Sequence, residues 1–171
     1  MRHRLAAVIL ALVCASPAAA VDLPTRKAGL WEIKSASEGG QMPAQTILQC
    51  IDAATDKLMQ EKFSGGGDLC SKQDMRKSGD SLVVESSCKI GTTAMKVRAV
   101  FEGDFQSAYT VKVSTTQEGA PSQPGGTTNL TMQGKWLGAC KADQKPGDIE
   151  MPGGMKMNIL DLPKTPAAPQ R

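Results

Sequence analysis

The sequence has a single histidine, His3, and it lies in an N-terminal leader, so the rest of the chain has none. Histidine is the side chain that most often performs general acid–base catalysis and most often binds transition metals. Aromatic residues are scarce too, with two tryptophans, one tyrosine and three phenylalanines. The lack of histidine outside the leader excludes most familiar hydrolase and metalloenzyme chemistry. The scarcity of aromatic residues leaves few large side chains to anchor a hydrophobic core.

Residues 1–20 have the features of a secretory signal peptide. Arg2 and Arg4 provide a positive start, residues 5–15 are apolar but too short to span a bilayer, and three alanines end at Ala20. We therefore expect cleavage after Ala20 and a periplasmic or secreted product. A lipoprotein processed at Cys14 is the alternative, although bulky Val13 precedes that cysteine where a small residue is usual. No later segment has the roughly 18 apolar residues of a transmembrane helix.

Charge gives no sign of a nucleic-acid partner. Removing Arg2 and Arg4 from the 20 basic residues leaves a near balance with the 17 acidic ones. A nucleic-acid interface calls for a basic patch with interleaved aromatics, and the sequence has no such segment.

Alternating apolar and polar residues predict a mainly β fold. We expect an antiparallel meander of about seven strands that forms a curved sheet or a partly closed barrel. One short helix is predicted from the cap Asp52 to about Lys62, ended by the glycines at 65–67. The alternation assigns these residues to the apolar faces of strands: Trp31 and Ile33; Met95, Val97, Ala99 and Phe101; Tyr109, Val111 and Val113; Leu130, Met132, Gly134 and Trp136. The expected apolar face of the helix holds Ile51, Ala54, Leu58 and Phe63.

The chain after the leader divides into two parts. Residues 21–140 are predicted to form a β domain stapled by disulfides. Residues 141–171 contain several prolines and little apolar periodicity, so we expect a mostly disordered tail. On this interpretation, a chain that ends just after Cys140 keeps its fold.

Four cysteines remain after the leader, and they allow three pairings. A three-residue loop at 78–80 would place Cys70 directly opposite Cys88, close enough for a bridge, which leaves Cys50 to pair with Cys140. A β-bulge in either strand would change this register and remove the support for the pairing. Free functional thiols are the alternative, but the C-x-x-C spacing that favours them is absent.

The sequence contains no convincing catalytic motif. Ser86 and Lys89 match the S-x-x-K pattern, but in a predicted strand these positions point to opposite faces. The glycines at 65–67 lack the Gly-Lys-Ser/Thr of a phosphate loop. The carboxylates Glu85, Glu102 and Asp104 are expected at the surface, and no spacing sets two of them across a cleft. We therefore expect a protein that is not an enzyme and needs no cofactor.

Three methionines in the tail, Met151, Met155 and Met157, form the one cluster with metal-binding chemistry. Thioethers are soft ligands that select Cu(I), so copper handling is an alternative function. The competing interpretation is that these methionines pack on an apolar patch or have no role.

Several segments together resemble a known family. They are residues 26–33 (Arg-Lys-Ala-Gly-Leu-Trp-Glu-Ile), the pair Gln49-Cys50 before the helix, Cys70 and Cys88 on either side of a turn, and residues 134–140 (Gly-Lys-Trp-Leu-Gly-Ala-Cys). This pattern is similar to domain-of-unknown-function family 3617, whose members are small secreted bacterial proteins. The resemblance covers most of residues 26–140 and implies a β-rich envelope protein. It implies no activity.

The function expected from these observations is binding. The partner is either a small apolar or amphipathic ligand within the curved sheet or another envelope protein, with Gly134 making room for a cavity. A structural or interaction protein with a filled core is the alternative.

Overall fold

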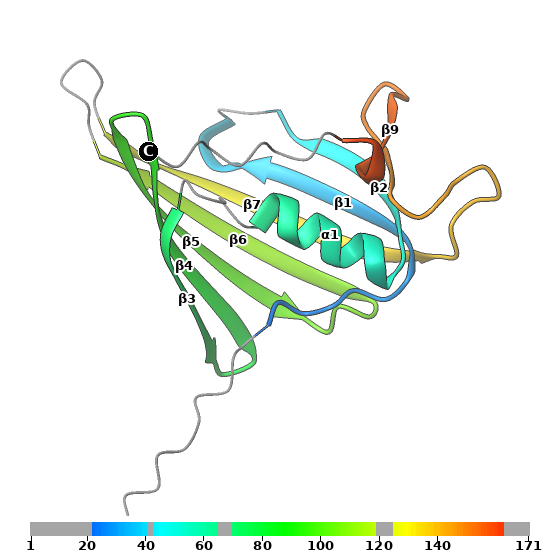
Figure 1. Cartoon of the computed structure of the whole chain (residues 1–171), viewed down its shortest axis with the longest axis horizontal. Helices are drawn as coiled ribbons and strands as arrows, with labels where there is room; N and C mark the ends of the chain where they lie inside the picture. The colour runs from blue at the N-terminus through cyan, green and yellow to red at the C-terminus, as the bar shows by residue number, and fades with distance from the viewer. Residues whose placement is uncertain (1–21, 41–42, 65–69, 119–124, 163–171) are drawn as a thin grey trace, which may run out of the picture.

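The computed structural model describes residues 22–40, 43–64, 70–118 and 125–162. These residues form one antiparallel sheet of nine strands in the order β3-β4-β5-β6-β7-β1-β2-β8-β9 (Figure 1). The strands are β1 (Gly29–Ser37), β2 (Gln45–Ile51), β3 (Cys70–Ser78), β4 (Ser81–Ile90), β5 (Thr93–Gly103), β6 (Ala108–Gln117), β7 (Gly126–Gly138), β8 (Asp148–Glu150) and β9 (Lys156–Asn158). The helix α1 (Ala53–Ser64) follows β2, and two 3-10 turns, η1 (Glu38–Gly40) and η3 (Ile159–Asp161), follow β1 and β9.

The predicted fold class is confirmed, since the described residues are mainly β, with one α-helix and one antiparallel sheet that does not close. Strands β3 to β7 form the expected meander, and β7 then pairs with β1. Nine strands are present where about seven were expected, because β8 and β9 lie in the segment predicted to be disordered. The leader, with Cys14 and Ala20, and the glycines at 65–67 lie outside the described residues.

The strands present their side chains as the alternation predicts. Directly opposed residues of antiparallel strands share a face, and the registers place Trp31 opposite Trp136, and Val111 opposite both Phe101 and Met132. We call this apolar side, which also carries α1, the inner face. The other side, the outer face, bears exposed ion pairs such as Lys112–Glu102 and Arg76–Glu85.

The helix begins as predicted, but its buried side differs in part from the expected one. The backbone N–H of Thr55 donates to the Asp52 carboxylate at 2.8 Å, which is the expected N-cap. The buried residues of α1 are Thr55, Asp56 and Met59, whereas Ala54 is exposed. The predicted apolar face is confirmed at Ile51 and Leu58, which lie in or against the core, and is wrong at Ala54, because a polar contact described below also selects the side of the helix that faces the sheet. The Phe63 side chain lies outside the described part of the structure.

Both predicted disulfides are present, Cys50–Cys140 and Cys70–Cys88. For Cys70–Cys88, the predicted pairing is correct, but the three-residue turn on which it was based is not present. Ser78 pairs with Ser81 across a two-residue turn, and an irregularity between Ser71 and Gln73 adds one residue to β3. The shorter turn and the bulge offset each other, so Cys70 still lies opposite Cys88.

The prediction of a mostly disordered tail is wrong for the described part of residues 141–162. This segment returns to the sheet, where β8 pairs with β2 and β9 pairs with β8. Ile149 and Ile159 are among the most buried residues of the chain, with 5% and 0% of their surface exposed. Too few apolar residues lie in each short element to give a periodic pattern, so sequence alone missed them. Residues 163–171 lie outside the described residues.

Candidate functional site

The inner face divides into two regions that differ in how they are covered. In one region, α1 and the segment that ends in η3 pack against buried residues of β1, β2 and β8, and Tyr109 of β6 and Trp136 of β7 lie against the same cluster. Figure 1 shows α1 in front of the sheet. We call the buried residues there the covered core: Trp31, Ile33, Ile51, Met59, Ile149 and Ile159. No residue of β3, β4 or β5 belongs to this cluster.

The second region lies beyond α1, and we call it the distal apolar surface. It consists of half-buried apolar side chains that the strand registers place on the inner face: Met75, Val97, Ala99, Phe101, Val113, Leu130 and Met132. Val84 and Val111 lie among them and are buried. A contiguous, partly exposed apolar surface of this kind is typical of a contact site for an apolar group.

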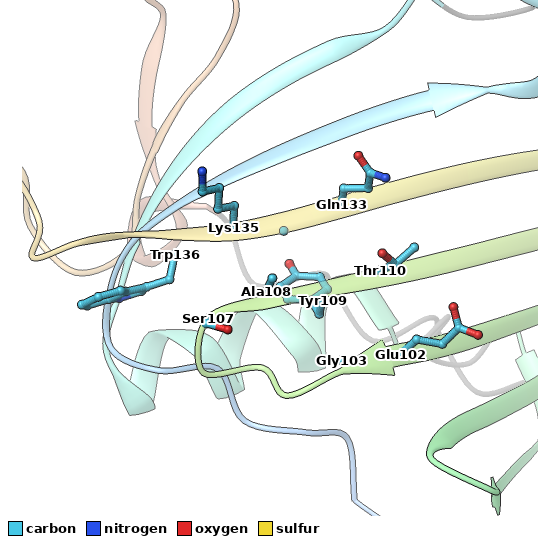
Figure 2. A pocket seen from close by; sticks show the side chains of 10 residues that line it. Glu102, Gly103, Ser107, Ala108, Tyr109, Thr110, Gln133, Lys135 and Trp136 are labelled. Carbon is cyan, nitrogen blue, oxygen red and sulfur yellow. The ribbon is translucent and has the colours of Figure 1, made fainter.

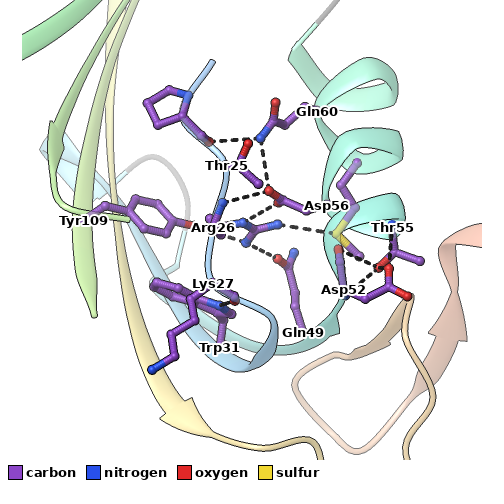
Figure 3. A network of polar contacts seen from close by, with 12 residues as sticks. Thr25, Arg26, Lys27, Trp31, Gln49, Asp52, Thr55, Asp56, Gln60 and Tyr109 are labelled. Carbon is purple, nitrogen blue, oxygen red and sulfur yellow. Dashed lines mark hydrogen bonds and ion pairs between the residues drawn. The ribbon is translucent and has the colours of Figure 1, made fainter. Parts of the chain in front are cut away.

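A buried ion pair lies between α1 and the sheet (Figure 3). Arg26 Nε lies 2.7 Å from Asp56 Oδ1, and the Arg26 backbone N–H donates to Asp56 Oδ2 at 2.9 Å. The Asp56 side chain is fully buried and that of Arg26 is 11% exposed. A buried charge pair is strongly destabilised when either partner is lost, so this contact fixes the side of α1 that faces the sheet.

The sheet completes the contacts of the Arg26 guanidinium. Its Nη1 donates to Gln49 Oε1 at 2.7 Å and to the Tyr109 hydroxyl at 3.3 Å. Gln60 of α1 donates to Asp56 Oδ2 at 3.2 Å. Within the described residues, no buried side-chain nitrogen or oxygen lacks a hydrogen-bond partner. The cluster therefore ties the N-terminal segment, the helix and two strands together.

Residues 27–29, which follow Arg26, contact both tryptophans and the end of β7, and we call this segment the strap. The Lys27 ammonium lies 3.7 Å from the centroid of the Trp136 ring, and the Lys27 carbonyl accepts a hydrogen bond from the Trp31 indole at 2.7 Å. The Trp136 indole donates to the carbonyl of Ala28 at 3.1 Å. Gly29 has a φ of 130°, and a Cβ there would collide with the carbonyl of Gly138. These contacts explain in structural terms why the Arg-Lys-Ala-Gly-Leu-Trp residues occur in this segment.

The Tyr109 ring fills the space that Gly134 was expected to leave on the inner face. The two residues are directly opposed on β6 and β7, and the Tyr109 ring lies where a Cβ of Gly134 would be. Phe105 stacks on the same ring with centroids 4.8 Å apart. Burial raises the pKa of Tyr109. Gly134 therefore makes room for an aromatic ring of the same chain.

A shallow depression of about 710 Å³ lies on the outer face at the ends of β5, β6 and β7 (Figure 2). Its lining includes Glu102, Thr110, Gln133 and Lys135. Glu102 is paired with Lys112 at 3.2 Å, and the lining carries no cluster of acid–base groups. The depression offers no arrangement that would activate a nucleophile or hold a cofactor.

The three carboxylates expected at the surface are engaged with neighbours. Glu85 binds Arg76, whose hydrogen bond holds the pKa of that carboxyl below its usual range. Asp104 accepts backbone hydrogen bonds from Gln106 and Ser107, both at 2.8 Å, and these lower its pKa strongly. Ser86 and Lys89 both lie in β4, where an odd spacing puts them on opposite faces. None of these groups forms an acid–base pair.

The three methionines of the copper hypothesis differ in their surroundings. Met151 and Met157 pack against the covered core, whereas Met155 is 65% exposed. Packing uses two of the three thioethers, which supports the interpretation that they fill space. Among the described residues, no three His, Cys, Asp or Glu side chains are placed to hold a metal ion.

Comparison with known proteins identifies the family. Residues 26–140 match the family described as "Protein of unknown function (DUF3617)". The chain belongs to the DUF3617 family. The match begins at Arg26 and ends at Cys140, so it spans the strap, the ion pair and both disulfides but not β8, β9 or η3. No curated protein and no solved structure matches the DUF3617 chain. Among the described residues, no helix is long and apolar enough to cross a membrane.

Sequence reasoning missed the ion pair between Arg26 and Asp56. Arg26 and Gln49 were noted only as part of the family resemblance, and Asp56 was not noted at all. A charged residue on the buried side of a short helix is a weak signal by itself. Nothing in the spacing connects it to a residue 30 positions earlier.

Proposed function

We propose that this protein is an exported, non-enzymatic binding protein whose distal apolar surface holds the apolar part of a small amphipathic ligand. The observation that carries the proposal is the division of the inner face. Apolar side chains continue across β5, β6 and β7, and among the described residues no side chain of β5 belongs to the cluster that α1 and the C-terminal segment bury. A half-covered apolar face of this kind favours a ligand that completes the burial.

The polar chemistry of the described residues supports a binding role over catalysis. The most buried charged group, Asp56, is held by Arg26 and Gln60 and is not left free to react. The one histidine of the sequence, His3, lies in the leader, and the lack of histidine elsewhere also favours binding over catalysis. Two disulfides, one of them joining residues 90 positions apart, are typical of proteins that work in oxidising compartments. This supports export.

The amphipathic character of the ligand follows from the borders of the surface. Its apolar residues lie beside polar inner-face positions such as Ser86, Thr115 and Gln117, which the registers place on the same side. An apolar chain would lie on Ala99 and Val113 while a polar head remained near these groups or in water. A partner protein with an apolar loop would use the same surface, and it is the alternative occupant.

The test uses an amphipathic fluorescent probe, anilinonaphthalene sulfonate, with the mature protein. Ala99→Glu places a carboxylate in the distal apolar surface. Ser114→Glu is the matched control, because Ser114 lies on the neighbouring strand but opposite Arg98 on the outer face. We expect the first variant to lose most of the probe fluorescence and the second to keep it, with both melting cooperatively. Equal probe binding by the two variants, or none by the wild-type protein, would contradict the proposal and leave the filled-core alternative.

A further inference from the structure

Strand β3 lies at one end of the sheet. It pairs with β4 on one side, and no described strand lies on its other side (Figure 1). An edge strand presents backbone N–H and C=O groups to solvent and serves as a template for another strand. At nine residues β3 is a long edge strand, and its bulge lies at the N-terminal end, so the regular part from Gln73 to Ser78 remains available for pairing.

The turn that follows β3 determines which backbone groups point outward. Ser78 and Ser81 flank a two-residue turn, so they exchange both hydrogen bonds across the hairpin. Because bonding alternates along an antiparallel pair, Arg76 and Asp74 also bond to β4. The backbone groups of Met75 and Lys77, and of Gln73 before them, therefore point away from the sheet.

Charges on β3 are arranged so that it complements itself. Asp74 and Arg76 flank Met75, and both side chains are exposed, at 67% and 46%. When two copies of β3 pair antiparallel with Met75 opposite Met75, each Asp74 lies opposite the partner's Arg76. These are the non-hydrogen-bonded positions, where opposed side chains are closest. A shift of two residues, which preserves the hydrogen bonding, instead sets Asp74 against Asp74 or Arg76 against Arg76.

We propose that β3 is a homodimer interface, at which two copies of the chain join their sheets edge to edge in this one register. The edge strand supplies backbone hydrogen bonds, as in other strand-addition contacts. The charges of Asp74 and Arg76 favour this register over its neighbours. They also favour a second copy as the partner, since a two-fold interface must be self-complementary. On the outer face, the Asp74–Arg76 contacts would continue the ion pairs that Glu85 makes with Arg76 and Arg98.

Dimerisation through β3 would also join the two distal apolar surfaces. Met75 lies on the inner face opposite Val84, so the two Met75 side chains would meet between the two distal apolar surfaces, with Lys77, which lies on the same face opposite Leu82, beside each of them. The two α1 helices would lie at its far ends. This consequence rests on the proposed function, whereas the dimer itself does not.

The experiment exchanges charges between two variants of the disulfide-bonded mature protein. Asp74→Arg makes both flanking residues basic, and Arg76→Asp makes both acidic, so each variant alone opposes like charges across the interface. We expect wild-type protein to form dimers as its concentration rises in sedimentation velocity, and each variant to lose at least about tenfold in dimer affinity. An equal mixture should form the heterodimer, which native mass spectrometry separates from homodimers by mass.

Lys112→Asp is the control, since it makes the same charge change as Arg76→Asp on a central strand. It should dimerise like the wild type, and circular dichroism should show that all three variants fold. The proposal is overturned if wild-type protein stays monomeric at every concentration. It is also overturned if Asp74→Arg dimerises like the wild type, or if the mixture forms no heterodimer. Probe binding by a monomeric variant would show that the binding function stands apart from the dimer.

Discussion

The two regions of the inner face have similar apolar strands but are completed differently. In the covered core, Trp31 and Ile33 meet side chains from α1 and from the C-terminal segment, and a buried ion pair holds the helix in place. On the distal apolar surface, equivalent positions such as Val97 and Val113 remain half-buried. The difference shows that strand alternation alone creates an apolar face. What covers that face depends on contacts between distant parts of the sequence.

The largest expected effect comes from ending the chain just after Cys140. This removes Ile149 and Ile159 from the covered core, and truncation of one such buried isoleucine to alanine typically costs roughly 2–5 kcal/mol. We now expect the truncated protein to lose cooperative unfolding in urea or to fall far below the wild-type midpoint. A truncated chain with the wild-type midpoint would restore the view that residues 21–140 fold alone. Leu160→Ala is the control, since Leu160 is 62% exposed.

Asp56→Ala should give the next largest effect. It leaves Arg26 buried without its partner, and breaking a buried ion pair typically costs roughly 3–5 kcal/mol. Urea denaturation followed by circular dichroism measures the change. Glu102→Ala removes an exposed pair with Lys112 and should change the midpoint little. If the two variants were equally stable, the ion pair would not be what holds α1 against the sheet.

A matched pair of methionines compares the two regions directly. Met59 is 3% exposed in the covered core, and Met132 is half-buried on the distal apolar surface. Met59→Ala should cost roughly 2–5 kcal/mol, whereas Met132→Ala should cost about 1 kcal/mol, since part of that side chain already contacts water. Chemical denaturation of both variants under one set of conditions gives the comparison. Equal losses would mean that the distal apolar surface is packed as a filled core.

The smallest effect is a spectroscopic one at Tyr109, the only tyrosine in the chain. Burial raises its pKa in the folded protein. Its contribution to stability is therefore complete below the usual value of about 10 and is lost as pH rises through the folded pKa. Absorbance of the phenolate against pH should give a midpoint above that of the urea-unfolded chain. Coincident midpoints would show that the ring does not stay buried over Gly134.

The strand faces were predictable because alternation is a local property. The faces of Trp31, Val97, Val113 and Met132 follow from their immediate neighbours. The Cys70–Cys88 pairing was also predicted, but by two errors that offset each other, since neither the two-residue turn nor the bulge leaves a clear trace in the sequence.

Predictions failed where a contact joins distant segments. The side of α1 that faces the sheet depends on Arg26 and Asp56, and two polar residues give no apolar pattern. The C-terminal strands of three residues each are too short for alternation to be recognised. Gly134 was interpreted as empty space because its cross-strand neighbour, Tyr109, could not be identified before the register was known.

The long-range disulfide has a consequence for how the chain is made. A polypeptide emerges from its N-terminus, so Cys50 is followed by Cys70 and Cys88 well before Cys140 appears. In an oxidising environment, this order exposes Cys50 to two wrong partners during synthesis and transport. The Cys70–Cys88 bond removes both of them, and it is favoured by proximity, because the two cysteines lie opposite each other in one hairpin and are only 18 residues apart. When this hairpin bond forms first, Cys140 is the one partner left to Cys50 among the four cysteines, and the native connectivity then needs no thiol–disulfide reshuffling.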